Sequence, residues 1–264
     1  PQEPFIYNLL GILYAHFGSF EDSINNYSRA IKLNPEYFEA YNNVGVAYIS
    51  WKKFSKAIEH FNKAIQINPS YADAYNNKGN ALKEKKEYKL ALKSYEKSIT
   101  LNPNFIDAIS NAGIIYDIMN DFTNAKKYFN QALSFDPNNI SLLYNLANCL
   151  FNHKDYERSL NVCQKIIGLD VSFYYAYSRI GLCYIQLEDE EKAKVFFEKA
   201  INLNPDYLEG LINYGLVLQK ERNFSLAATQ FEKALRINPK SDEAHVNLSK
   251  VYLDGGLLSK AIDV

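Results

Sequence analysis

Prolines recur along this chain at a fixed interval of 34 residues. The series comprises Pro35, Pro69, Pro103, Pro137, Pro205 and Pro239, and Val171 stands in the one missing place. A fixed period of this length is typical of stacked supersecondary units, each of which buries its apolar face against its neighbours. The period therefore favours a repeat array over a domain built around one central core.

Small and aromatic residues keep the same period. A small residue recurs at Gly11, Gly45, Gly79, Gly113, Ala147, Gly181, Gly215 and Ser249. An aromatic residue recurs at Tyr27, Phe61, Tyr95, Phe129, Phe197 and Phe231. We expect the small residues to let two helices approach closely while the ring fills the space beside them. A larger residue at Gly79 should therefore overpack this joint.

The period divides the chain into seven full repeats and a partial eighth. Their bounds are 4–37, 38–71, 72–105, 106–139, 140–173, 174–207, 208–241 and 242–264. In the second repeat, Tyr41, Val44 and Tyr48 recur at helical spacing and predict a helix over 39–52. A second helix is predicted over 55–67, before Pro69. We thus predict an all-α fold, an α-solenoid of helix–turn–helix repeats forming a single array over 1–264.

These recurring positions resemble those of the tetratricopeptide repeat (TPR) family, and the resemblance covers essentially the whole chain. It implies a right-handed superhelix in which the first helix of each repeat lines the inner face. The pentatricopeptide RNA-binding repeats are a neighbouring possibility, but their usual period is one residue longer and they lack this Gly, Ala and Pro pattern. The resemblance further implies a protein or peptide partner.

Two adjacent asparagines stand in the first helix of several repeats. The second member belongs to a row that reads Leu9, Asn43, Asn77, Asn111, Asn145, Arg179, Asn213 and Asn247. The first belongs to a row that begins Asn8, Asn42 and Asn76 and turns from polar to apolar further along. A row of amides can donate to and accept from an extended peptide backbone. It is similar to the asparagine ladder in the TPR superhelix of O-GlcNAc transferase, which implies peptide binding by these asparagines. The alternative is that they bond to the adjacent repeat and tighten the stacking.

The fifth and sixth repeats depart from the pattern. Tyr144 and Phe151 are seven residues apart on one helix and share a face, and Tyr175 begins the next inner helix. Val171 removes a proline stop at this joint, which could widen the groove. We expect Tyr144, Phe151 and Tyr175, flanked by Arg179, to anchor an apolar residue of the partner. The alternative is that these rings only pack on one another.

Composition limits the kind of partner. The chain is 47% hydrophobic and 22% charged, as in folded proteins, and its net charge of −1 disfavours a nucleic-acid partner. No apolar run approaches the ~18 residues of a membrane span, so we expect no membrane insertion. Three cysteines, an odd number without close pairs, do not form a disulfide framework, so we expect a reducing intracellular compartment, which we take to be the cytoplasm. They also lack a zinc-binding spacing. No catalytic, metal or cofactor motif is apparent, so no cofactor is expected.

These features predict a non-catalytic scaffold that binds a partner segment in its concave groove. Two alternatives remain open: a substrate-recruiting arm of a larger enzyme, such as a glycosyltransferase, and a structural subunit of a large assembly. Since the chain starts at Pro1 and stops within a repeat, we expect it to be a fragment of a longer protein. The sequence does not identify the partner or the oligomeric state.

Overall fold

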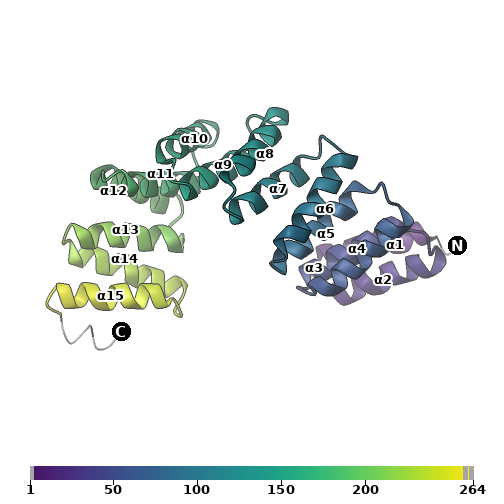
Figure 1. The fold of residues 1–264 in the computed structure, drawn as a ribbon. Coiled ribbons are helices and arrows are strands. Elements are labelled where there is room, and N and C mark those ends of the chain that lie inside the picture. Colours follow the sequence, from purple (N-terminus) through teal and green to yellow (C-terminus); the bar gives the residue numbers. More distant parts are fainter. Residues whose placement is uncertain (1–2, 258–260, 262–264) are drawn as a thin grey trace. The chain divides into compact units, whose positions relative to one another are not determined.

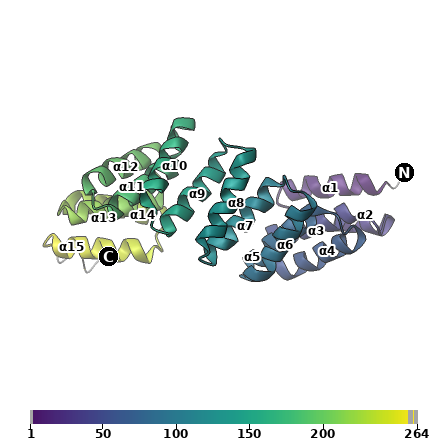
Figure 2. The ribbon, with the colours of Figure 1, turned by 45° about the horizontal axis from the view of Figure 1, so that its top comes forward.

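A computed structural model describes residues 3–257 and Ala261, and across them the chain forms fifteen α-helices and no β-strand. The residues of the partial eighth repeat at 258–260 and 262–264 lie outside this description. By their internal contacts the helices form two compact units, an amino-terminal unit (Pro1–Pro137) and a carboxy-terminal unit (Asn138–Val264). Each unit is built of helix pairs (Figures 1 and 2).

The amino-terminal unit contains α1(Pro4–His16), α2(Phe20–Leu33), α3(Phe38–Ser50), α4(Phe54–Ile67), α5(Ala72–Glu84), α6(Tyr88–Leu101), α7(Ile106–Ile118) and α8(Phe122–Phe135). The carboxy-terminal unit contains α9(Ile140–Asn152), α10(Tyr156–Leu169), α11(Tyr174–Gln186), α12(Glu190–Leu203), α13(Leu208–Lys220), α14(Phe224–Ile237) and α15(Asp242–Asp254). Within each unit every helix packs on the next, and most odd-numbered helices also touch the following odd-numbered one. This is the arrangement of an all-α solenoid, as predicted.

A residue in the left-handed backbone region ends each first helix and turns the chain into the second. In six repeats it is not glycine: Lys52, Lys86, Asn120, Lys154, Glu188 and Arg222 have φ between 57° and 63°. Gly18 and Gly256 take the same place in the first and last repeats. Because Lys52 leaves the helical region, α3 ends at Ser50, two residues before the predicted end.

An Asn or Asp side chain holds the turn between repeats. In the first such turn, Glu36 donates its backbone N–H to Oδ1 of Asn34 over 3.1 Å. The same bond is made at Asn68, Asn102, Asp170, Asn204 and Asn238. Asp170 precedes Val171, and α10 ends there as the other second helices do. The expectation that Val171 removes the stop at this joint is therefore wrong, because the carboxylate of Asp170 makes the turn without proline.

The glycine series packs against the aromatic series. A Cβ added at Gly79 would lie 2.5 Å from Cε1 of Tyr95, and one added at Gly45 would lie 2.4 Å from Cε1 of Phe61. Both rings are fully buried. Glycine is therefore needed where a ring lies directly over the helix backbone, which agrees with the expectation for Gly79.

Candidate functional site

The paired asparagines of the amino-terminal unit bond to one another across the joints between repeats. Nδ2 of Asn43 donates to Oδ1 of Asn8 over 3.0 Å, Nδ2 of Asn77 to Oδ1 of Asn42 over 3.0 Å, and Nδ2 of Asn111 to Oδ1 of Asn76 over 3.1 Å. In each bond the second asparagine of one pair meets the first asparagine of the preceding repeat, 35 residues earlier. The alternative to peptide binding, in which the asparagines bond to the adjacent repeat, thus describes contacts that exist in this unit.

A further amide extends this network in the third and fourth repeats. Asn80 lies one turn after Asn76 on α5, and its Oδ1 accepts hydrogen bonds from Nδ2 of Asn111 over 3.2 Å and from the Tyr95 hydroxyl over 2.8 Å. Since the Tyr95 ring also covers Gly79, this network connects the polar row to the packed core. Burial raises the pKa of Tyr95, so its hydroxyl remains a donor well above neutral pH.

The two members of each pair differ in exposure. Asn8, Asn42 and Asn76 are buried, whereas Asn43 and Asn77 are half-buried. Within the described residues, each of these two half-buried amides uses one of its two N–H groups in the bond across the joint, which leaves an N–H and the Oδ1 lone pairs for another partner. The stacking bond and a bond to a ligand are therefore compatible on one side chain.

The same row continues in the carboxy-terminal unit at Asn145, Asn213 and Asn247. Asn213 on α13 and Asn247 on α15 are half-buried, and neither side chain makes a hydrogen bond within the described residues. The residues that precede them by 35 positions are Ser178 and Ile212 rather than asparagine. Their amides keep their full hydrogen-bonding capacity.

Five aromatic side chains of the carboxy-terminal unit form a connected group, which we call the aromatic cluster. Its members are Tyr144, Phe173, Tyr174, Tyr175 and Tyr207, with neighbouring ring centroids 4.2–6.0 Å apart. The structure thus brings together Tyr144 and Tyr175, as expected from the sequence, at 6.0 Å. Tyr175 is 38% exposed, which leaves an open edge on the cluster.

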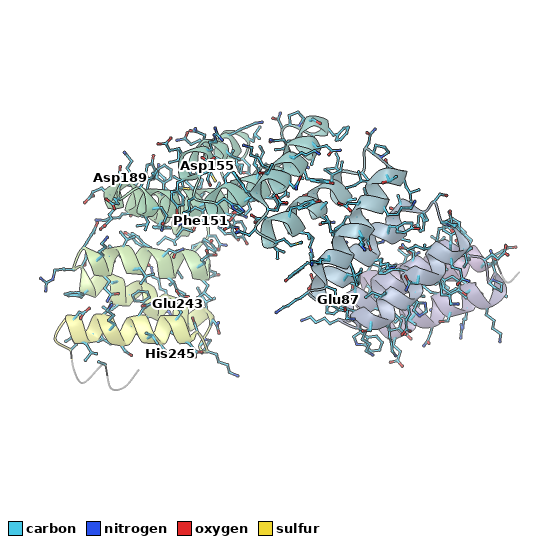
Figure 3. The ribbon with its side chains drawn as sticks, viewed as in Figure 1. Glu87, Phe151, Asp155, Asp189, Glu243 and His245 are labelled. Atoms are coloured by element: carbon cyan, nitrogen blue, oxygen red, sulfur yellow. The ribbon has the colours of Figure 1, made fainter. Side chains whose placement is uncertain are left out.

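Arg179 connects Phe151 to this cluster. Its guanidinium carbon lies 4.6 Å from the centroid of the Phe151 ring, a cation–π distance. Phe151 also meets Tyr156 edge to face, and it lies on α9 just before the turn that contains Asp155 (Figure 3). Burial raises the pKa of Tyr144, while the Arg179 guanidinium beside its hydroxyl opposes that rise. Arg179 therefore lies between the two predicted anchors.

Three members of the cluster were not predicted. Tyr174 is the first residue of α11, and the other two are Phe173 and Tyr207. Both occupy the residue just before a first helix, in a series that reads Tyr37, Tyr71, Phe105, Asn139, Phe173, Tyr207 and Ser241. This period-34 aromatic series was a usable signal. The Tyr207 hydroxyl donates to Oε2 of Glu209 over 3.2 Å and lies 3.4 Å from Oγ of Ser178, and burial raises its pKa.

The three cysteine thiols lie in the interior of the helix pairs. Cys149, Cys163 and Cys183 are buried thiols, and burial raises the pKa of Cys163 to about 12. A thiol with so high a pKa is a poor nucleophile at neutral pH. Within the described residues, no helix has the length and apolar character that crossing a membrane requires.

Comparison with known proteins gives a consistent result. Family profiles described as tetratricopeptide repeat or TPR repeat match residues 11–50, 38–71, 72–105, 118–180, 174–207 and 214–264. No curated protein matches the sequence.

Solved structures of other proteins are similar to this chain. YrrB, described as a TPR protein with an unusual peptide-binding site, is 25% identical with a TM-score of 0.57, over 70% of this chain and 95% of YrrB. A tetratricopeptide repeat protein from Parabacteroides merdae is 16% identical with a TM-score of 0.76, over 96% of this chain and 100% of the other.

Proposed function

The chain belongs to the tetratricopeptide repeat family, and from this premise we propose that it is a non-catalytic scaffold that holds an extended peptide along its asparagine row. TPR repeats in general support a role in protein interactions. The proposal adds the ligand's form, an extended segment, and the side chains that bind it: Asn43, Asn77, Asn111, Asn145, Asn213 and Asn247.

One observation carries the proposal: four amides of this row, those of Asn43, Asn77, Asn213 and Asn247, retain hydrogen-bonding groups within the described residues after the repeats have stacked. Asn43 and Asn77 are each held at one N–H by the preceding repeat, so their side chains are fixed in direction before a ligand arrives. An amide fixed in advance loses little conformational entropy when it binds. Its remaining N–H and C=O can pair with the alternating C=O and N–H groups of an extended backbone.

The aromatic cluster supplies the second element of the proposal. We assign it, with Phe151 and Arg179, to an apolar side chain of the bound peptide. Aromatic rings are rigid and large, which suits them to anchor a partner at low entropic cost. The likeness to YrrB, which is described as having a peptide-binding site, supports a peptide as the ligand.

The experiment is a selection of extended peptides from a display library, followed by calorimetry on purified variants. Asn213→Ala/Asn247→Ala removes two amides that make no hydrogen bond within the described residues, so stability should hardly change while affinity falls. Asn130→Ala/Asn161→Ala, exposed residues of second helices, is the matched control and should bind as the original chain does. Equal affinity of the selected peptides for both double variants and the original would contradict the proposal, as would the failure of any peptide to be selected.

A further inference from the structure

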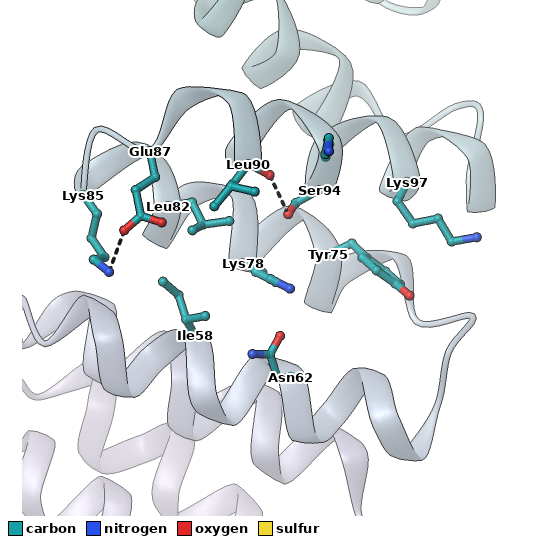
Figure 4. Close-up of a pocket in the computed structure, with 11 residues that line it drawn as sticks. Ile58, Asn62, Tyr75, Lys78, Leu82, Lys85, Glu87, Leu90, Ser94 and Lys97 are labelled. Atoms are coloured by element: carbon teal, nitrogen blue, oxygen red, sulfur yellow. Dashed lines mark hydrogen bonds and ion pairs between the residues drawn. The ribbon is translucent and has the colours of Figure 1, made fainter.

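A cavity of about 480 Å³ opens between α4, α5 and α6, wholly within the amino-terminal unit (Figure 4). Its apolar walls are Ile58, Leu82 and Leu90, and its polar lining includes Asn62, Tyr75 and Ser94. Four lysines border it: Lys78, Lys85, Lys93 and Lys97. Its volume is within the range of small-molecule sites, which span ~300–1,000 Å³.

Lys78 breaks the packing pattern of the repeats. The equivalent residue of the other seven repeats is apolar: Leu10, Val44, Ala112, Leu146, Ile180, Tyr214 and Leu248. All of these except Leu10 are buried. A lysine at a core position loses hydration without improving the packing. Packing therefore does not explain why the third repeat has lysine where the other repeats have apolar residues.

The small side chain of Ser94 on α6 lines the same cavity as Lys78. The equivalent residues of the neighbouring repeats are larger, namely His60 and Tyr128. The Ser94 hydroxyl is turned to the carbonyl oxygen of Leu90, to which it donates over 3.0 Å. Figure 4 shows the amine of Lys78 extending between Asn62 and Tyr75.

The charges around this cavity are unbalanced. The one carboxylate of the lining, Glu87, is 2.7 Å from Nζ of Lys85. Within the described residues, the ammonium groups of Lys78, Lys93 and Lys97 make no ion pair and no hydrogen bond to a side chain. Burial lowers the pKa of Lys78, because it removes water from the ammonium group, and an anion bound beside the amine would oppose this shift.

We propose that this cavity binds a phosphomonoester carried on an apolar body, with Lys78 as the central ligand and Lys93 and Lys97 at the border of the cavity. A phosphomonoester has nearly two negative charges at neutral pH, which suits three unpaired ammonium groups better than a single carboxylate does. Ile58, Leu82 and the Tyr75 ring accommodate the apolar body. The source of the phosphate is either a phosphorylated side chain or a free small molecule.

This site is distinct from the asparagine row. At 3.6 residues per turn, Lys78 and Asn80 lie roughly 200° apart around α5, and so do Tyr75 and Asn77. The cavity thus lies across α5 from the proposed peptide face. The two proposals can fail independently.

The test is calorimetric titration with phenyl phosphate against the original chain and Lys78→Leu. Leucine is the residue that three other repeats carry at this position, so the variant should fold, and its melting temperature should equal or exceed that of the original. We expect a Kd on the order of 1 mM for a ligand of this size. Lys78→Leu should weaken it about ten- to a hundredfold, since it removes a hydrogen bond to a charged group.

Three controls sharpen the result. Lys127→Leu removes the lysine equivalent to Lys93 in the next repeat, and it should leave the affinity unchanged. Phenol, which lacks the anion, should bind at least tenfold more weakly than phenyl phosphate. The tripeptide Ala-phosphotyrosine-Ala identifies the source: tighter binding than phenyl phosphate assigns the site to a phosphorylated protein segment, and weaker or equal binding to a small phosphate ester.

The proposal would be overturned by equal affinity of the original chain and Lys78→Leu for phenyl phosphate. Loss of affinity in Lys127→Leu as large as in Lys78→Leu would also overturn it, because the effect would then reflect general charge alone. Absence of measurable binding to the original chain, or equal binding of phenol, would have the same consequence.

Discussion

The side-chain amide of Asn77 donates a hydrogen bond to Oδ1 of Asn42 across the joint between two successive repeats, over 3.0 Å. Asn42 is buried and Asn77 is half-buried, so the bond satisfies a group that has little access to water. The bond explains why two adjacent asparagines return 34 residues later. Each pair supplies a donor to the preceding repeat and an acceptor to the following one.

Asn77→Ala should lower the free energy of unfolding by ~1–3 kcal/mol, because it leaves the buried Oδ1 of Asn42 without its partner. Urea denaturation measures this change. Asn213→Ala is the matched control: its amide bonds to nothing within the described residues, and alanine is the better helix former. Its stability should be equal or slightly higher. If both variants lost the same stability, the bond across the joint would not be the cause.

Gly79→Ala should destabilise the chain by ~1–3 kcal/mol, since the added Cβ would lie 2.5 Å from the buried Tyr95 ring. Gly168→Ala on α10 serves as its control, because a Cβ there meets nothing within 4 Å. Glycine is a poor helix residue, so Gly168→Ala should stabilise by ~0.5–1 kcal/mol. Thermal melts of the two variants should therefore shift in opposite directions. A gain in stability at Gly79 would rule out the close-packing account.

Lys86→Gly should raise the free energy of unfolding by about 1 kcal/mol. Lys86 has φ of 61°, a region that costs a residue with a Cβ ~1–2 kcal/mol and costs glycine nothing, although glycine has more entropy to lose on folding. Asn120→Gly should give a smaller gain, because asparagine tolerates φ of 62° better than lysine does. Chemical denaturation compares the two. Equal gains would show that the backbone strain does not depend on the side chain.

His60 should make stability depend on pH in the mildly acidic range. Burial lowers its pKa below 6.5, and its buried Nδ1 has no hydrogen-bond partner among the described residues. The unfolded chain therefore binds this proton at a higher pH than the folded chain does, so stability falls as pH drops below about 6.5. The sixth repeat carries Phe196 at the position equivalent to His60, so His60→Phe should fold. In this variant the loss of stability that is due to His60 at low pH should be absent. Urea titrations at pH 5.5 and 7.5 measure it, and an unchanged difference between the two pH values would exclude His60.

Phe151→Ser should weaken binding of a selected peptide by ~2 kcal/mol or more, if the anchoring role proposed for Phe151 holds. The change also removes the ring under the Arg179 guanidinium, so the affinity must be measured by calorimetry on a variant shown to be folded. Phe135→Ser, at the 44% exposed end of α8, provides a control that should bind normally. An unchanged affinity in folded Phe151→Ser would remove this ring from the site.

Much of the fold could be predicted from the sequence because its determinants are local and repeated. The start of α3 at Phe38 and the packing of Gly79 against an aromatic ring both follow from short-range patterns that recur every 34 residues. The turn at Val171 shows the limit of one such pattern. Proline marks the turn in the sequence, but the hydrogen bond that the Ser172 backbone N–H donates to Asp170 makes it. The carboxylate of an aspartate accepts this bond as well as the amide oxygen of an asparagine does.

The repeat, the helices and the rows of residues that share a face follow from the sequence alone, since period and propensity act within one or two turns. The direction in which each side chain bonds depends instead on the packing of the helices. This packing turns the amide of Asn77 toward Asn42 and places Arg179 over the Phe151 ring. The cavity lined by Lys78 and by the small side chain of Ser94 on another helix depends on it as well. The physical reason is that these contacts depend on the volumes and rotamers of residues far apart in sequence, which no single repeat specifies alone.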